Sequence, residues 1–140
     1  LVTKGYVPPI HDFVISDLNG NDYTGDFLGA EHAVLIVSPF LDKARGDAWI
    51  KVAALVDWAR RNDIKIAILT GSGREEIESF GKRFAADSWP FYQADGTVLK
   101  TMMRSNPGLV LLNKGTVQDL IPARRLPSPD ELGRRIGSLR

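Results

Sequence analysis

The sequence predicts one α/β domain with a central mixed sheet of four or five strands and helices on both faces. Three successive patterns indicate this fold: an apolar run at residues 33–37, an amphipathic helix at about 47–62, and a second apolar run at 64–69. A strand, a crossover helix and a further apolar strand form a parallel pair with a right-handed connection. The chain has 140 residues, 44% of them hydrophobic, which suits a single core.

The first part of the chain predicts a short lead-in at residues 1–11, followed by a hairpin. Pro8-Pro9 favours extended backbone in the lead-in. Apolar and polar residues then alternate up to Asn19-Gly20, a strong signal for a tight turn. We therefore expect a hairpin over residues 12–24.

Two helices with apolar residues three or four positions apart are expected at residues 47–62 and 74–86. Between them, the apolar run at 64–69 is expected to be a strand buried on both faces. Gly71-Ser72-Gly73 precedes the second helix and is interpreted as a plain turn between strand and helix, because it lacks a complete phosphate-binding motif.

The last third of the chain predicts an antiparallel hairpin and a terminal helix. A short extended piece at 89–92 and a short helix at 97–104 are followed by strands at 109–112 and 116–120, which flank a turn. Ser128 then fits the N-cap of a final helix, with a proline at the first helical position.

This order of elements resembles thioredoxin-like domains, most nearly the TlpA and peroxiredoxin branch. The stretch DFVISDLNGNDYTGDFLG is similar to the opening of TlpA-like domains. In that family the first core strand runs into a CxxC motif, and the CxxC positions are filled here by residues 42–45, which read Asp-Lys-Ala-Arg. The resemblance implies a thioredoxin-like three-layer sandwich with an N-terminal hairpin over residues 12–140, after the lead-in at 1–11.

The absence of cysteine bears directly on activity. Thiol–disulfide exchange requires a thiolate, and the chain has no cysteine to provide one. We therefore expect no thiol–disulfide oxidoreductase activity from this chain alone, no catalytic residue and no cofactor.

The resemblance also implies a binding face. Pro107 precedes the strand at 109–112 and matches the family's cis-proline by position, so we expect a cis bond at Asn106-Pro107. In the family, the extended backbone of a substrate pairs with the residue before this proline. The face transferred in this way comprises Phe40, Leu41, Asp42, Lys43, Arg45, Ser105, Asn106 and Pro107. A solvated charged loop is the alternative interpretation of the residues that replace the CxxC motif.

Charge and histidine content argue against two other classes of function. A net charge of +1, from 18 basic and 17 acidic residues, gives no electrostatic case for nucleic acid. His11 and His32 are the two histidines, and their spacing fits no metal site, so we interpret both as surface residues.

We therefore expect a non-catalytic thioredoxin-like module used for binding or structural support. The chain begins with Leu1, so we expect a piece of a larger bacterial protein, with any membrane segment outside these residues and the compartment left open. Residues 89–117 resemble the C-terminal soluble domain of DoxX-family bacterial membrane proteins. The partner is expected to be a protein, an extended peptide or a neighbouring domain of the parent chain. The alternative function is an accessory or substrate-binding domain of a thiol–disulfide redox system whose cysteines lie on another domain or partner.

Overall fold

A mixed five-stranded sheet forms the centre of the molecule. The structure is a computed structural model that describes residues 14–41, 46–103 and 105–137. The strands lie in the order β3-β2-β1-β4-β5, with β1 parallel to β2 and antiparallel to β4. The sheet predicted from the sequence is therefore confirmed. Its strands are β1 (His32–Val37), β2 (Lys65–Thr70), β3 (Phe91–Gln93), β4 (Gly108–Asn113) and β5 (Thr116–Pro122).

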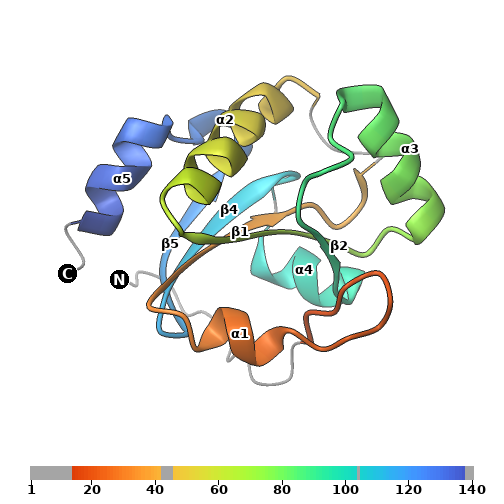
Figure 1. The fold of residues 1–140 in the computed structure, drawn as a ribbon, viewed down its shortest axis with the longest axis horizontal. Helices are drawn as coiled ribbons and strands as arrows, with labels where there is room; N and C mark the ends of the chain where they lie inside the picture. Colours follow the sequence, from red (N-terminus) through yellow and green to blue (C-terminus); the bar gives the residue numbers. More distant parts are fainter. Residues whose placement is uncertain (1–13, 42–45, 104, 138–140) are drawn as a thin grey trace.

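Helices cover both faces of the sheet and make three layers, as expected (Figure 1). In the view of Figure 1, α2, α3 and α5 lie above the sheet, and α1 and α4 lie below it. A short 3-10 helix at Ala123–Arg125 follows β5. The α-helices are α1 (Thr24–Leu28), α2 (Ala48–Arg61), α3 (Arg74–Phe84), α4 (Gly96–Met102) and α5 (Pro129–Gly137).

The core consists of two apolar layers, one on each side of β1. Val34 and Ile36 face the layer of α2, α3 and α5, whereas Leu35 and Val37 face that of α1 and α4. This alternation explains why the strand is apolar at every position, since a strand covered on both faces exposes neither of its sides.

An aromatic cluster packs α3 against α2 and the sheet. The ring centroid of Phe80 lies 4.7 Å from that of Trp49, 4.6 Å from that of Phe84 and 5.7 Å from that of Phe91. Such edge and tilted contacts add to the free energy gained by burying the rings. The cluster anchors the second half of α3, which holds Phe80 and Phe84.

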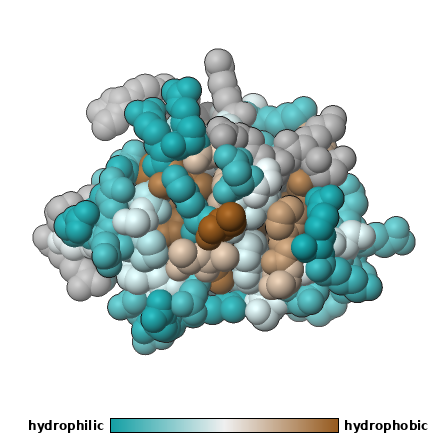
Figure 2. Space-filling view, turned by 90° about the horizontal axis from the view of Figure 1, so that it is seen from above, coloured by the Kyte–Doolittle hydropathy of each residue, from teal (hydrophilic) through white to brown (hydrophobic). Residues whose placement is uncertain are grey.

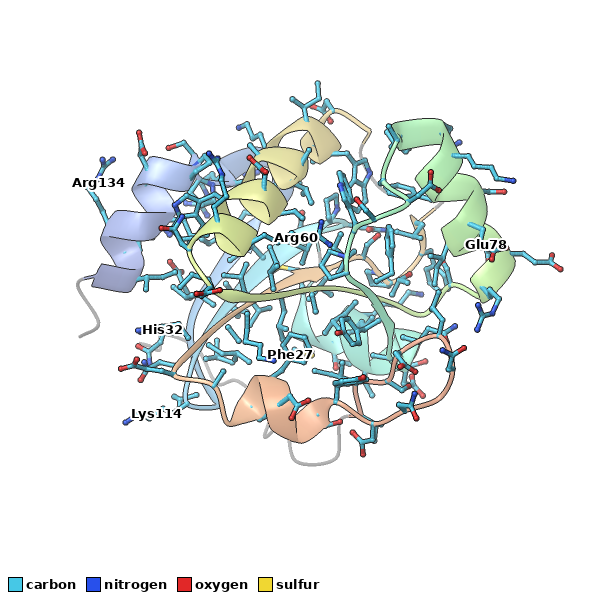
Figure 3. The ribbon with its side chains drawn as sticks, viewed as in Figure 1. Phe27, His32, Arg60, Glu78, Lys114 and Arg134 are labelled. Carbon is cyan, nitrogen blue, oxygen red and sulfur yellow. The ribbon has the colours of Figure 1, made fainter. Side chains whose placement is uncertain are left out.

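The outer surface of α2, α3 and α5 is largely hydrophilic. Figure 2 looks onto this side and shows a small apolar patch near its centre. Ile50 on α2 is 79% exposed. Glu78 on α3 and Arg134 on α5 point away from the body at opposite ends of the molecule (Figure 3). None of the helices in the described ranges is long and apolar enough to cross a membrane.

The N-terminal hairpin is shorter than expected. Within the described part of residues 12–24, it consists of a single bridge between Ser16 and Asp22, and Ser16 also forms a bridge to Gln93 in β3. The helix α1 follows immediately and was not predicted. Its five residues are too few for a helical period to be visible, and Phe27 anchors it by packing 5.1 Å from the ring of Tyr92.

A carboxylate organises the tight turn of this hairpin. Asp17 Oδ1 accepts hydrogen bonds from the main-chain N–H groups of Asn19 and Asn21, both at 2.9 Å. Asp17 Oδ2 accepts from Asn21 Nδ2 at 3.0 Å. The side-chain hydrogen bond from Asn21, followed by the main-chain bonds, lowers the pKa of Asp17 below its ordinary value.

The interpretation of His32 as a surface residue is wrong. His32 begins β1 and is only 6% exposed. Its Nε2 is buried and has no hydrogen-bond partner among the described residues, while Nδ1 lies 3.4 Å from Asn113 Nδ2. The pairing of β1 with β4 encloses the ring, because His32 lies opposite Asn113. Figure 3 shows His32 and Lys114 at the same end of the sheet. His11 lies outside the described residues, as does the lead-in at 1–11.

Candidate functional site

The candidate face lies where β1 and β2 end and β4 begins. Val37, the last residue of β1, pairs with Leu69 of β2 and with Gly108 of β4. The segments that follow or precede these strands therefore meet at one edge of the sheet. In α/β sheets this edge, beyond the carboxyl ends of parallel strands, is the usual place for a binding site.

The side chain of Asn106 connects two of these segments. Asn106 Oδ1 accepts a hydrogen bond from Ser38 Oγ at 2.6 Å. Asn106 Nδ2 donates to the main-chain carbonyl of Phe40 at 2.9 Å. The Asn106-Pro107 bond is cis, as expected from the sequence. The face therefore brings Phe40, Asn106 and Pro107 together.

The main chain of Asn106 remains available. Neither its N–H nor its carbonyl has a hydrogen-bond partner in the part of the chain that the structure describes. The residue is half-buried. One donor and one acceptor on an extended segment could pair with these two groups, as one residue of an added β-strand would.

Ser105 has a structural use. Its hydroxyl donates to the carbonyl of Pro107 at 2.9 Å and accepts from the main-chain N–H of Ala123 at 2.8 Å. The side chain thus ties the start of β4 to the end of β5. Because both bonds are internal, the Ser105 side chain contributes to the shape of the face more directly than to contact with a partner.

A second set of bonds fixes the loop after β1 to the turn after β2. The main-chain N–H of Leu41 donates to Ser72 Oγ at 3.1 Å, and Gly71 N–H donates to the Pro39 carbonyl at 3.0 Å. Ser72 is only 3% exposed, and its own N–H donates to Thr70 Oγ1 at 3.1 Å. The turn at residues 71–73 therefore supports this loop, in addition to leading into α3.

Leu41 borders a hollow of about 540 Å³ that extends along one side of α3, from Glu75 to Arg83. Leu41 and Phe80 supply its apolar part, and both are at most 3% exposed. The remaining lining is polar and comes from α3: Glu75, Glu76, Ser79 and Arg83. The hollow can accept a mixed polar and apolar side chain.

The ring of Phe40 lies against α4. A Cβ atom built on Gly96 would be 3.8 Å from Phe40 Cζ, which is ordinary van der Waals contact. Lys100 Nζ lies 4.9 Å from the centroid of the same ring. Phe40 thus contacts α4 through its ring and Asn106 through its carbonyl.

The remaining residues of the predicted face, Asp42, Lys43 and Arg45, lie outside the described residues. Among the residues that are described, no group of three or more histidine, aspartate and glutamate side chains is placed to hold a metal ion.

Sequence reasoning missed three side chains of this region, namely Ser38, Ser72 and Lys100. Ser38 could have been found from the register, since it follows Val37 directly and Val37 pairs with Gly108. Ser72 was noted only as part of a turn. No sequence signal places Lys100 over Phe40, because that contact depends on the path of α4 across the sheet.

Comparison with known proteins establishes the fold. No family model matches the sequence, and no curated protein does. The exposed lipoprotein thioredoxin Etrx1 of Streptococcus pneumoniae is 14% identical with a TM-score of 0.68, over 89% of this chain and 97% of that one. A thioredoxin-like protein from Aeropyrum pernix is 15% identical with a TM-score of 0.65, and the match covers 89% of this chain and 88% of that one.

A secreted disulfide oxidoreductase of Mycobacterium tuberculosis, homologous to E. coli DsbE, is 16% identical with a TM-score of 0.63, over 89% of this chain and 94% of that one. Identities this low show a shared fold and do not transfer an activity. The chain has the thioredoxin-like fold and contains no cysteine.

Proposed function

We propose that this chain is a non-catalytic thioredoxin-like module that binds an extended segment of a partner protein at the face formed by Phe40, Leu41, Asn106 and Pro107. The observation that carries the proposal is the main chain of Asn106, whose N–H and carbonyl have no partner among the described residues. A bound segment would satisfy both groups by pairing as a short β-strand.

The way Asn106 is held supports this proposal. Its side chain is bonded at both ends, to Ser38 and to Phe40, so the orientation of its peptide groups is fixed before a partner arrives. A prearranged site loses less conformational entropy on binding than a mobile one. The chain has no cysteine, so the face cannot perform thiol chemistry, which is consistent with a role in recognition.

We further propose that the module is the C-terminal soluble domain of a larger bacterial membrane protein of the DoxX family. The support is the similarity of residues 89–117 to such domains. In that arrangement the partner segment comes either from another protein or from a neighbouring domain of the parent chain.

Selection from a displayed library of random octapeptides on the immobilised chain tests the binding proposal. We expect enrichment of peptides that bind wild type and lose at least about tenfold in affinity with Phe40→Ala, because this variant removes the aromatic ring of the face. Leu120→Ala is the matched control, since Leu120 is a partly exposed apolar residue on β5. Failure to enrich any peptide, or equal loss with both variants, would contradict the proposal.

The alternative is an accessory domain of a thiol–disulfide redox system, with its cysteines on another domain or partner. The secreted disulfide oxidoreductase that shares the fold gives this alternative its support. It predicts that the selected peptides contain cysteine and bind differently when reduced and oxidised. The chain alone should not accelerate insulin reduction by dithiothreitol under either hypothesis.

A further inference from the structure

Among the described residues, Lys100 is a cationic side chain that lies against the aromatic ring of the candidate face. Its Nζ lies 4.9 Å from the centroid of the Phe40 ring, while the carbonyl of Phe40 accepts the Asn106 side-chain amide at 2.9 Å. Phe40 therefore contacts both the ammonium group of Lys100 and the side chain of Asn106, the residue whose main-chain N–H and carbonyl are available for pairing.

The charge of Lys100 has no carboxylate partner among the described residues. The ion pairs of the described chain lie elsewhere, between Arg61 and Asp57 and around Arg135. The nearest acid along α4 is Asp95, whose Oδ1 accepts from the N–H groups of Thr97 and Val98 at the start of the helix. The Asp95 carboxylate thus caps the helix. The ammonium group of Lys100 is therefore available to a ligand bound at the face.

The ring also positions this charge. Phe40 is half-buried and its ring lies over Gly96, so it forms a fixed surface below the lysine side chain. An ammonium group over an aromatic ring is attracted to it electrostatically. This attraction restricts the positions that the ammonium group occupies. A carboxylate that arrives beside the ring meets a positive charge whose position is already restricted.

We infer that Lys100 is a specificity-determining residue, and that the extended segment bound at Asn106 carries an acidic side chain beside the Phe40 ring. This inference rests on the proposed peptide binding and adds the chemistry of the peptide. Lys100 provides the charge, Phe40 positions it, and Asn106 sets the register of the bound backbone.

The peptides selected on wild type test the inference first. We expect glutamate or aspartate to be enriched at one position, and this enrichment to be lost when selection is repeated on Lys100→Met. If no peptide is enriched, the proposed function itself fails. If peptides are enriched without an acidic position, or keep it with Lys100→Met, the inference is wrong and the binding function stands.

Affinity measurements on one selected peptide and its Glu→Gln or Asp→Asn analogue give the second test. For an exposed charge pair we expect Lys100→Met to weaken binding of the acidic peptide by about twofold to fivefold, and to leave the affinity of the neutral analogue nearly unchanged. Lys100→Arg should restore the preference, and added salt should reduce it. Lys82→Met on α3 removes the same charge from an exposed site and should leave both affinities unchanged.

An equal loss for the acidic peptide and its neutral analogue would overturn the inference, because it would show that Lys100 acts only by supporting Phe40. The same conclusion would follow if Lys82→Met reduced the acidic preference as strongly as Lys100→Met, since net charge alone would then explain the preference.

Discussion

Asn106 donates its side-chain amide to the main-chain carbonyl of Phe40 at 2.9 Å, across 66 positions of the sequence. The other end of the same side chain accepts from Ser38 at 2.6 Å. The segment before Pro107 is thus fixed to the loop after β1 by one polar side chain. This amide is one of the side chains that hold the face in shape, together with the hydroxyls of Ser72 and Ser105.

Replacing Asn106 with alanine should destabilise the domain. Asn106→Ala removes both bonds and leaves the Phe40 carbonyl without this donor, so the free energy of unfolding should fall by about 1–3 kcal/mol. Urea unfolding followed by tryptophan fluorescence measures the change. Gln118→Ala, which removes an exposed amide from β5, should change stability by less than about 0.5 kcal/mol. Equal stability of Asn106→Ala and wild type would show that the two bonds do not hold the face.

Gly71 should not accept a side chain. A Cβ atom at this position would lie 2.8 Å from Gly96 Cα and 3.2 Å from the Pro39 carbonyl oxygen, both of them main-chain atoms. Gly71→Ala should therefore lower the midpoint of thermal unfolding and cost about 1–3 kcal/mol, as overpacking does. Gly25→Ala is the control, because a Cβ there has no atom within 4 Å and alanine favours the helix α1. If Gly71→Ala is as stable as wild type, as Gly25→Ala is expected to be, then α4 does not approach this turn as closely as the structure places it.

His32 should be replaceable by an apolar residue without loss of stability. Its Nε2 is buried without a partner in the described structure, and such a group costs about 1–3 kcal/mol. His32→Leu removes this cost, and imperfect packing of the leucine offsets part of the gain in stability. We therefore expect the free energy of unfolding to rise by about 1 kcal/mol. The matched comparison is Thr70→Val, which should destabilise, since Thr70 Oγ1 is buried and accepts from Ser72 N–H. A clear loss of stability in His32→Leu would mean that His32 Nε2 is not left unpaired, or that the contact of Nδ1 with Asn113 outweighs its cost.

Acidification should weaken the turn at Asp17. Because Asn21 and the neighbouring main chain lower the pKa of this carboxyl in the folded state, its contribution is present above the unfolded pKa and is lost as the pH falls through the lower folded pKa. The difference in stability between wild type and Asp17→Ala should therefore be larger at pH 7 than at about pH 2. Urea unfolding at both pH values gives the comparison, and a difference that is independent of pH would contradict the assignment.

The sequence predicted the large elements well for a physical reason. The strands at residues 33–37 and 64–69 are buried on both faces, and uninterrupted apolar runs carry that information locally. Ser128 and Pro129 mark the start of α5, where Glu131 N–H donates to Ser128 Oγ at 3.2 Å. Helix α1 escaped prediction because its stability comes from the burial of Phe27 against Tyr92, a residue far along the chain.

The candidate face could be predicted only in part. Its location followed from the resemblance, and the cis bond before Pro107 agrees with it. The bonds from Ser38 and to Phe40, and the position of Lys100, depend on distances between segments that are distant in the sequence. Residue patterns along a chain do not carry those distances, so the side chains that hold Asn106 were not identified.

Hydrogen exchange at the main-chain amide of Asn106 tests the central claim most directly. The amide is followed by NMR in the 15N-labelled chain, free and saturated with a selected octapeptide. Because the N–H has no partner in the described structure, we expect fast exchange in the free chain and at least about tenfold slower exchange with peptide bound. The amide of Ile36 in the buried strand β1 serves as reference and should be protected in both states. Exchange at Asn106 that stays unchanged while the peptide is bound would place the peptide elsewhere and contradict the account.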